Sequence, residues 1–93
     1  MAEITINGAN QWSPVVKIGT GRNYDVRVRS NSGFSGTIVV QRRRTGETDW
    51  YDVEGEVYTG VVDRFGQVAT PNWEFRIGSP DGSGSIVAGI WSE

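Results

Sequence analysis

The chain has 93 residues and a net charge of −2 at neutral pH, and it contains no leucine, histidine or cysteine. Without histidine and cysteine it lacks the usual general base, the thiol nucleophile and the preferred zinc ligands, so we expect no catalytic residue, no metal or cofactor site and no enzymatic activity. The acidic balance argues against nucleic acid as a partner, and neither a signal peptide nor an apolar run of about 18 residues indicates export or a membrane.

The apolar residues are mainly valine, isoleucine and aromatic types, which favour strands over helices. No segment shows a helical period. A chain of this length predicts one domain covering residues 1–93, with a core thin enough that a partner or a homo-oligomer would stabilise it.

Short strands are expected first, at residues 3–7 and 15–18. In the next strand Tyr24, Val26 and Val28 alternate with charged residues. Because side chains along a strand point to alternate faces, the apolar set should be buried and the charged set should face solvent or neighbouring strands.

Residues 36–42 are dense in β-branched side chains and predict a central strand. A polar spacer with Gly46 then predicts a β-hairpin to a strand at residues 49–53, with this glycine at positive φ. Trp50 and Tyr51 are adjacent on that strand, so their rings should point to opposite faces.

Two weaker strands are expected on either side of Gly60. A turn signature at residues 79–83 should then join a strand at residues 73–77 to one at residues 85–91, repeating the hairpin pattern. Together these elements predict an all-β fold, a small antiparallel β-sandwich of about seven strands, with a five- or six-stranded β-barrel as the alternative.

Two acidic patterns could carry chemistry. Asp52 and Glu54 lie two apart on one strand, which places their carboxylates about 7 Å apart, within the range that glycosidases use. The loop after Asp81 could offer oxygen ligands to calcium, but it lacks the repeated carboxylates of a dedicated loop. We therefore interpret the first as an acidic strand face and the second as a plain turn.

Basic and aromatic residues are the stronger candidates for binding. The only basic run, at residues 42–44, predicts either pairing with acidic residues of the same hairpin or contact with an acidic partner. Four tryptophans exceed what a thin core needs, so they predict plugs at the ends of the sandwich, anchors for protein contact or platforms for sugars. Phe34, between glycine and serine residues, is expected to be an end plug or a loop-tip anchor.

Residues 34–42 (FSGTIVVQR) and 50–53 (WYDV) resemble the central hairpin of small immunoglobulin-like β-sandwich modules in tailed-bacteriophage virions, which occur as capsid decoration (cement), neck and tail proteins. Residues 73–78 and 84–90 are similar to the end of that pattern, so the resemblance covers about two-thirds of the chain. Residues 43–47 depart from the Ser and Asp-Gly-Gly turn common in that pattern, so no property of that turn is carried over.

The resemblance implies a non-enzymatic virion protein, made in the host cytoplasm, that binds the major capsid protein or other virion proteins. A capsid decoration protein that clamps neighbouring subunits of the phage head is the first expectation. A neck or tail component is the alternative, and a carbohydrate-binding module is the alternative from another class. The residues expected to contact the partner are Trp12, Phe34, Arg43, Arg44 and Trp50.

Overall fold

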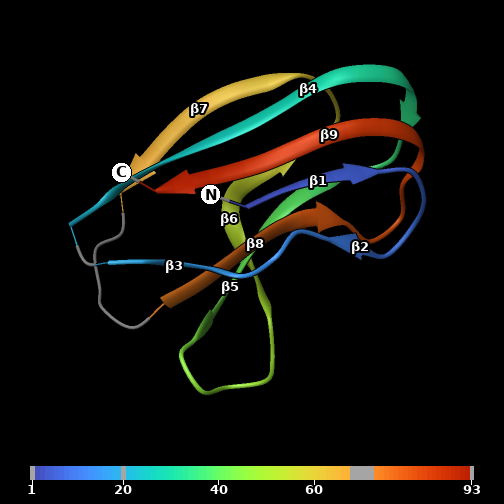
Figure 1. Ribbon diagram of the computed structural model, residues 1–93. Helices are drawn as coiled ribbons and strands as arrows, with labels where there is room; N and C mark the ends of the chain where they lie inside the picture. The colour runs from blue at the N-terminus through green and yellow to red at the C-terminus, as the bar shows by residue number, and fades with distance from the viewer. Residues whose placement is uncertain (1, 20, 68–72, 93) are drawn as a thin grey trace.

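The computed structural model describes residues 2–19, 21–67 and 73–92, which form nine β-strands and, within these ranges, no helix. The strands make two antiparallel sheets that lie face to face and do not close into a barrel (Figure 1). The predicted β-sandwich is therefore confirmed, and the barrel alternative is wrong. In the described part of the chain there is no helix long and apolar enough to span a membrane.

The two sheets share the strands almost equally. Sheet A has the order β1 (Ala2–Ile6), β9 (Ser83–Ser92), β4 (Asn23–Ser35) and β7 (Val62–Gln67). Sheet B has the order β2 (Gln11–Trp12), β8 (Trp73–Ser79), β5 (Ile38–Arg44) and β6 (Tyr51–Tyr58), and β3 (Val16–Ile18) also pairs with β8. The short strands β2 and β3 pair with successive parts of β8, so there are nine strand segments where about seven were predicted.

The core lies between the sheets and follows the predicted alternation. Tyr24, Val26 and Val28 on β4 are buried, and the Tyr24 ring centroid lies 5.7 Å from that of Phe75 on β8. Burying an aliphatic or aromatic side chain of this size stabilises the fold by about 1.5–3 kcal/mol. The rest of the cluster is formed by Ala2, Ile6, Ile18, Phe34, Ile38, Val40, Ile77, Ile86, Ala88 and Ile90.

The turn at residues 79–83 and the segment around Gly60 both carry the chain from one sheet to the other. β8 pairs with β5, whereas β9 pairs with β1 and β4, so the turn at residues 79–83 does not close a hairpin and that prediction is wrong. The segment around Gly60 likewise leads from β6 in sheet B to β7 in sheet A. Asp81 fixes the first corner, because its Oδ1 accepts a hydrogen bond from the backbone N–H of Thr37 at 2.9 Å.

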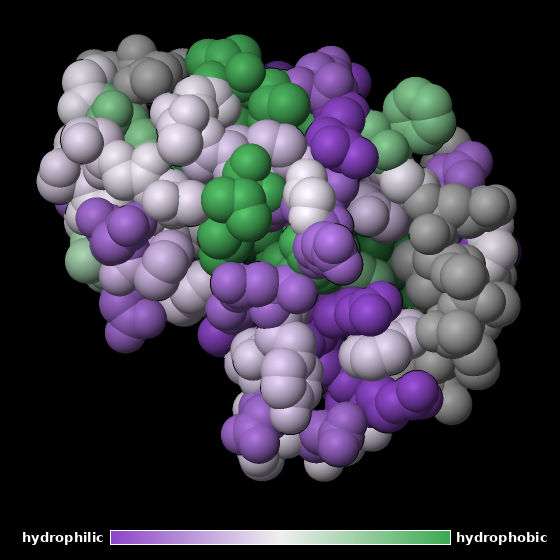
Figure 2. All heavy atoms as spheres, turned by 180° about the vertical axis from the view of Figure 1, so that it is seen from behind, coloured by the Kyte–Doolittle hydropathy of each residue, from purple (hydrophilic) through white to green (hydrophobic). Residues whose placement is uncertain are grey.

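The hairpin over Gly46 is confirmed, since β5 pairs with β6 and this glycine has a φ of 91°. Its tip extends beyond sheet A, at the bottom of Figure 1. Seen from behind, hydrophilic and near-neutral side chains cover this projection, whereas hydrophobic ones gather nearer the middle of the molecule (Figure 2). The tip of the hairpin therefore presents a polar surface, and the part of β5 nearer the middle of the molecule is anchored in the core.

A buried carboxylate connects the open edges of the two sheets. Glu56 on β6 is only 3% exposed; it accepts a hydrogen bond from the Tyr58 hydroxyl at 2.7 Å and pairs with Arg64 on β7 at 3.0 Å. Burial, the hydrogen bond to Glu56 and the charge of that carboxylate raise the pKa of Tyr58, and burial together with the same charge raises the pKa of Tyr24. The seam between β6 and β7 is thus held by a polar network beside the core.

Candidate functional site

The outer face of sheet B carries a row of aromatic and charged side chains, which we call the tryptophan–arginine ladder: Trp12, Arg76, Trp50, Arg43 and Glu74. The guanidinium carbon of Arg76 lies 4.3 Å from the ring centroid of Trp12 and 4.4 Å from that of Trp50. The guanidinium carbon of Arg43 also lies 4.4 Å from the Trp50 centroid, and its Nε pairs with Glu74 Oε1 at 3.0 Å. Partly desolvated cation–π contacts of this kind contribute about 0.5–2 kcal/mol each.

Strand alternation explains why the ladder forms on the outer face. Along β8, Glu74 and Arg76 alternate with the core residues Phe75 and Ile77, and Arg43 on β5 is directly opposite Glu74. A charged residue at these positions must point away from the core. The register of β5 against β8 therefore determines which arginine meets which ring.

Arg76 is the central member of the ladder and is fixed by hydrogen bonds as well as by stacking. Its Nε and Nη2 donate to Gln41 Oε1 at 3.0 and 2.8 Å, and Gln41 Nε2 donates to Asp52 Oδ1 at 2.9 Å. Burial, followed by the positive charge of Arg43, lowers the pKa of the Arg76 guanidinium. Arginine nevertheless stays charged at neutral pH, so a half-buried, immobilised cation sits between two indole rings.

Trp12 reaches the ladder because two features hold it against β8. Its Nε1 donates to Oδ1 of Asn10 at 3.1 Å, and Asn10 adopts a φ of 58°, a conformation that asparagine tolerates better than most residues. On β8, a Cβ at Gly78 would lie 2.6 Å from Cε3 of Trp12 and would collide with the backbone oxygen of Gln11. The indole therefore occupies space that only glycine leaves open.

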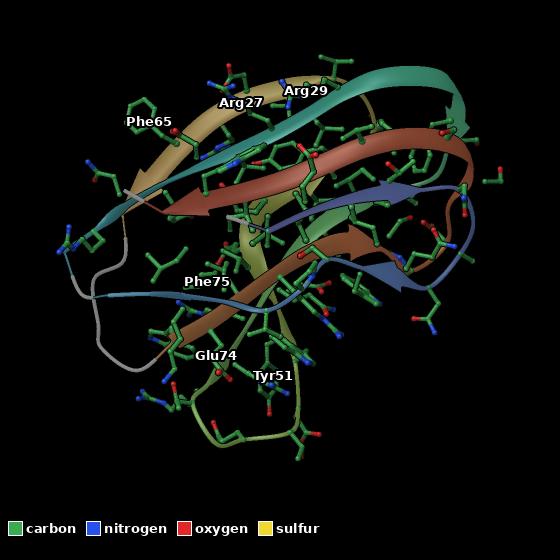
Figure 3. The ribbon with its side chains drawn as sticks, viewed as in Figure 1. Arg27, Arg29, Tyr51, Phe65, Glu74 and Phe75 are labelled. Atoms are coloured by element: carbon green, nitrogen blue, oxygen red, sulfur yellow. The ribbon has the colours of Figure 1, made fainter. Side chains whose placement is uncertain are left out.

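Arg42 and Arg44 point to the opposite side of the same hairpin, where they stack on Trp73. Their guanidinium carbons lie 4.2 and 4.8 Å from the Trp73 centroid. Both arginines are exposed. Tyr51 on β6, which is paired with Arg42, is 62% exposed. We call this surface the hairpin ledge, because it continues the inner side of sheet B beyond the edge of sheet A (Figure 3).

The outer face of sheet A has a looser arrangement of the same residue types. Arg27 and Arg29 on β4 lie 5.7 and 6.0 Å from the Trp91 centroid. They form ion pairs with Asp63 at 3.6 Å and with Glu3 at 3.3 Å. Figure 3 shows both arginines and Phe65 on this side, away from Glu74 and Tyr51. All four tryptophans are thus half-buried and each lies beside at least one arginine, and Trp73 also packs against the core.

The five residues expected to contact a partner fall into three places. The structure brings Trp12, Arg43 and Trp50 together in the ladder, whereas Arg44 lies on the ledge. Phe34 is 9% exposed and belongs to the core cluster, where it serves as an end plug, so we do not include it in a binding surface.

Sequence reasoning missed Arg76, the residue around which the ladder is built. Residues 73–77 alternate between apolar and charged types, which is typical of a strand with this arginine on its outer face. This alternation could not show that Trp12 and Trp50 flank Arg76, because Trp12 on β2 and Trp50, directly before β6, are far from Arg76 in sequence. The basic run was expected to pair with acidic residues of its own hairpin. Instead, Arg43 pairs with Glu74 on β8, and Asp52 accepts a hydrogen bond from Gln41.

The acidic candidates have structural roles. Asp52 accepts its hydrogen bond from Gln41 on the strand face, and Asp81 holds Thr37 at the corner between the sheets. No group of three or more carboxylates that could hold a metal ion occurs in residues 2–19, 21–67 and 73–92. The ladder and the ledge, where arginine side chains contact tryptophan rings, are therefore the candidate binding surfaces.

Comparisons of the chain with protein-family models, with curated proteins and with solved structures give no significant match. The resemblance to virion modules accordingly stays a prediction.

Proposed function

We propose that this protein is a non-enzymatic structural component of a tailed-bacteriophage virion that decorates the outer surface of the capsid. The observation that carries the binding function is the tryptophan–arginine ladder, a preformed surface on sheet B in which Arg76 is stacked and hydrogen-bonded. The resemblance of residues 34–42 and 50–53 to virion modules supports the capsid as the place where that surface is used.

A fixed tryptophan–arginine surface suits contact with another protein. Tryptophan and arginine are enriched among the residues that dominate binding energy at interfaces, and side chains already ordered before binding lose less conformational entropy. In the ladder Trp50 is held by Arg43 and Arg76, so it is presented in one orientation. Docked through this face, the sandwich would cover the joint between neighbouring capsid subunits.

Purified virions provide the first test. We expect mass spectrometry to find the protein in the particles at hundreds of copies per capsid, whereas a neck ring would hold about a dozen, as its lower symmetry requires. Absence from purified particles would contradict the proposal, and a copy number near a dozen would move the protein to the neck.

Binding to emptied capsids tests the ladder itself. We expect wild-type protein to co-sediment with capsids and to delay their disruption on heating, and Trp50→Ala to weaken both effects. Trp91→Ala on sheet A is the matched control, because it removes the same side chain from the other face. Equal effects of the two substitutions would show that the ladder is not the contact.

Carbohydrate binding is the competing function, since half-buried tryptophans on a sheet face can stack on sugars. In the ladder, guanidinium groups of Arg43 and Arg76 lie 4.4 Å from the Trp50 ring, where a sugar would stack. The geometry therefore favours protein contact. Glycan binding at millimolar concentration that disappears in Trp50→Ala would reverse this preference.

A further inference from the structure

The hairpin ledge carries positive charge that the described part of the chain does not neutralise. The ion pairs among the described residues involve Arg27, Arg29, Arg43 and Arg64, and none involves Arg42 or Arg44. Strand alternation produces this difference within one basic run. The middle arginine turns toward Glu74 on the ladder side, and its two neighbours turn to the other side.

Stacking on Trp73 orders the two guanidinium groups without using up their hydrogen-bonding capacity. A cation–π contact engages the flat face of a guanidinium, whereas its N–H donors lie in the plane and point outward. Arg42 and Arg44 are separated by two positions on one strand, about 7 Å. Both guanidinium carbons also lie close to the same Trp73 centroid, at 4.2 and 4.8 Å, so the two donor groups are near enough for one extended segment to contact both.

A hollow beside the ledge is bordered by the apolar side chains of Trp73 and Ile18 together with polar Lys17 and Thr45. It has a volume of about 160 Å³ and adjoins Trp73 and Thr45, the residue after Arg44. The hollow is lined by Lys17, Ile18, Gly19, Thr45 and Trp73. An occupant that fits this surface combines negative groups with an apolar side chain close to them.

We propose that the hairpin ledge binds an extended acidic segment of the partner protein, in which alternate carboxylates contact Arg42 and Arg44 and a following apolar side chain enters the hollow. This inference rests on the proposed protein-binding function and specifies the chemistry of the partner. Carboxylates match the planar fork of arginine in a two-pronged geometry. A net charge of −2 and a ledge of two arginines argue for a short acidic segment over a nucleic acid, whose binding depends on many cations.

The test uses a fluorescein-labelled peptide with the core Asp-Ser-Asp-Ser-Phe, which places both carboxylates and the ring on one side when extended. We expect fluorescence anisotropy at low salt to show binding, and the double variant Arg42→Gln/Arg44→Gln to weaken it at least about tenfold. The matched control is Arg27→Gln/Arg29→Gln, which removes an equivalent arginine pair beside Trp91, where Asp63 and Glu3 already neutralise it. This control should bind the peptide as the wild type does.

Three outcomes would overturn the proposal: no binding of the acidic peptide, equal weakening by the two double variants, or tighter binding of a single-stranded oligonucleotide of the same charge. A peptide with asparagine in place of aspartate should bind at least tenfold more weakly than the acidic one. Thermal unfolding of each variant shows that the fold is retained, which we expect because all four arginines are exposed.

Capsid binding separates this inference from the proposed function. If the ledge variant co-sediments with capsids as wild type does, the ledge is not the docking site, although decoration stands. If wild-type protein binds the acidic peptide but not capsids, decoration fails and the ledge stands.

Discussion

The two outer faces of the sandwich carry the same residue types, but their side chains are buried to very different extents. On sheet B, the side chains of Arg43 and Glu74 are 26% and 16% exposed in their ion pair, and Arg76 is wedged between two indoles. On sheet A, the side chains of Arg27 and Asp63 are 46% and 71% exposed. The first face is a fixed assembly, and the second is a set of surface contacts within reach of water.

The difference lies in what surrounds each arginine and not in the arginines themselves. Exposed ion pairs contribute only about 0–1 kcal/mol, because water and salt screen them and long side chains lose entropy on pairing. Removing water from a pair strengthens both its hydrogen bonds and its stacking. Sheet B achieves this because Gly78 lets Trp12 lie close to the backbone and cover Arg76.

Gly78→Ala should have the largest effect, since it breaks the face that is tightly packed. The new Cβ would collide with the Gln11 backbone oxygen and with Trp12, so we expect unfolding free energy to fall by about 2–3 kcal/mol in urea denaturation. Gly60→Ala is the control, because nothing lies within 4 Å of its Cβ position, and it should change stability little. Similar losses for both variants would contradict the close packing of Trp12.

Arg76→Ala against Arg27→Ala compares the two faces directly. We expect the first to cost about 1.5–2.5 kcal/mol, because it removes two hydrogen bonds to Gln41 and two cation–π contacts. The second should cost about 0.5 kcal/mol or less, as an exposed ion pair allows. Equal costs in the same urea titration would remove the distinction between the faces.

Alkaline titration tests the seam between β6 and β7 and should have a smaller effect on stability. The pKa of Tyr58 is raised in the folded protein by burial and by Glu56. A tyrosine with a raised folded-state pKa contributes stability that is complete below about pH 10 and is lost as pH rises toward the folded value. We expect the urea midpoint to decline above pH 10 and the decline to be shallower in Tyr58→Phe. An unchanged slope in that variant would show that this hydroxyl is not the group responsible.

Double-mutant cycles should give the smallest energies, and they compare one ion pair on sheet B directly with one on sheet A. For Arg43 and Glu74 on sheet B we expect a coupling of about 1 kcal/mol that persists in 1 M salt, because the pair is mostly covered. For Arg27 and Asp63 on sheet A the coupling should be about 0.3 kcal/mol and should vanish in salt. A salt-insensitive coupling on sheet A would mean that its pairs are better shielded than their exposure indicates.

Sequence alone predicted much of this fold because side-chain alternation is a local property. The buried set on β4 and the hairpin over Gly46 follow from residue order and turn chemistry. The assignment of strands to sheets does not: β8 and β9 are joined by a clear turn signature yet belong to different sheets. A turn describes how the chain reverses and not whether the reversed strand pairs with the one before it.

The candidate site was harder to predict for the same reason. Trp12 and Trp50 were chosen for their residue type. Arg76 on β8 meets both rings because β2 pairs with β8, and because β5 joins β8 to β6, which Trp50 directly precedes. Gly78 carries no sequence signal that distinguishes it from the other glycines; its importance comes from the indole lying on it. Tertiary register, which one sequence does not display, assembles the ladder.

The register of β5 against β8 also determines which residues form the ladder and which form the ledge. Arg43 lies opposite Glu74 and Arg44 opposite Trp73. A slip of one position would turn every β5 side chain to the other face, sending Arg42 and Arg44 to the ladder and Arg43 to the ledge. The same slip would expose Ile38 and Val40, which are fully buried on β5, so the core prevents it and thereby determines which arginines of the basic run are neutralised and which are left uncompensated.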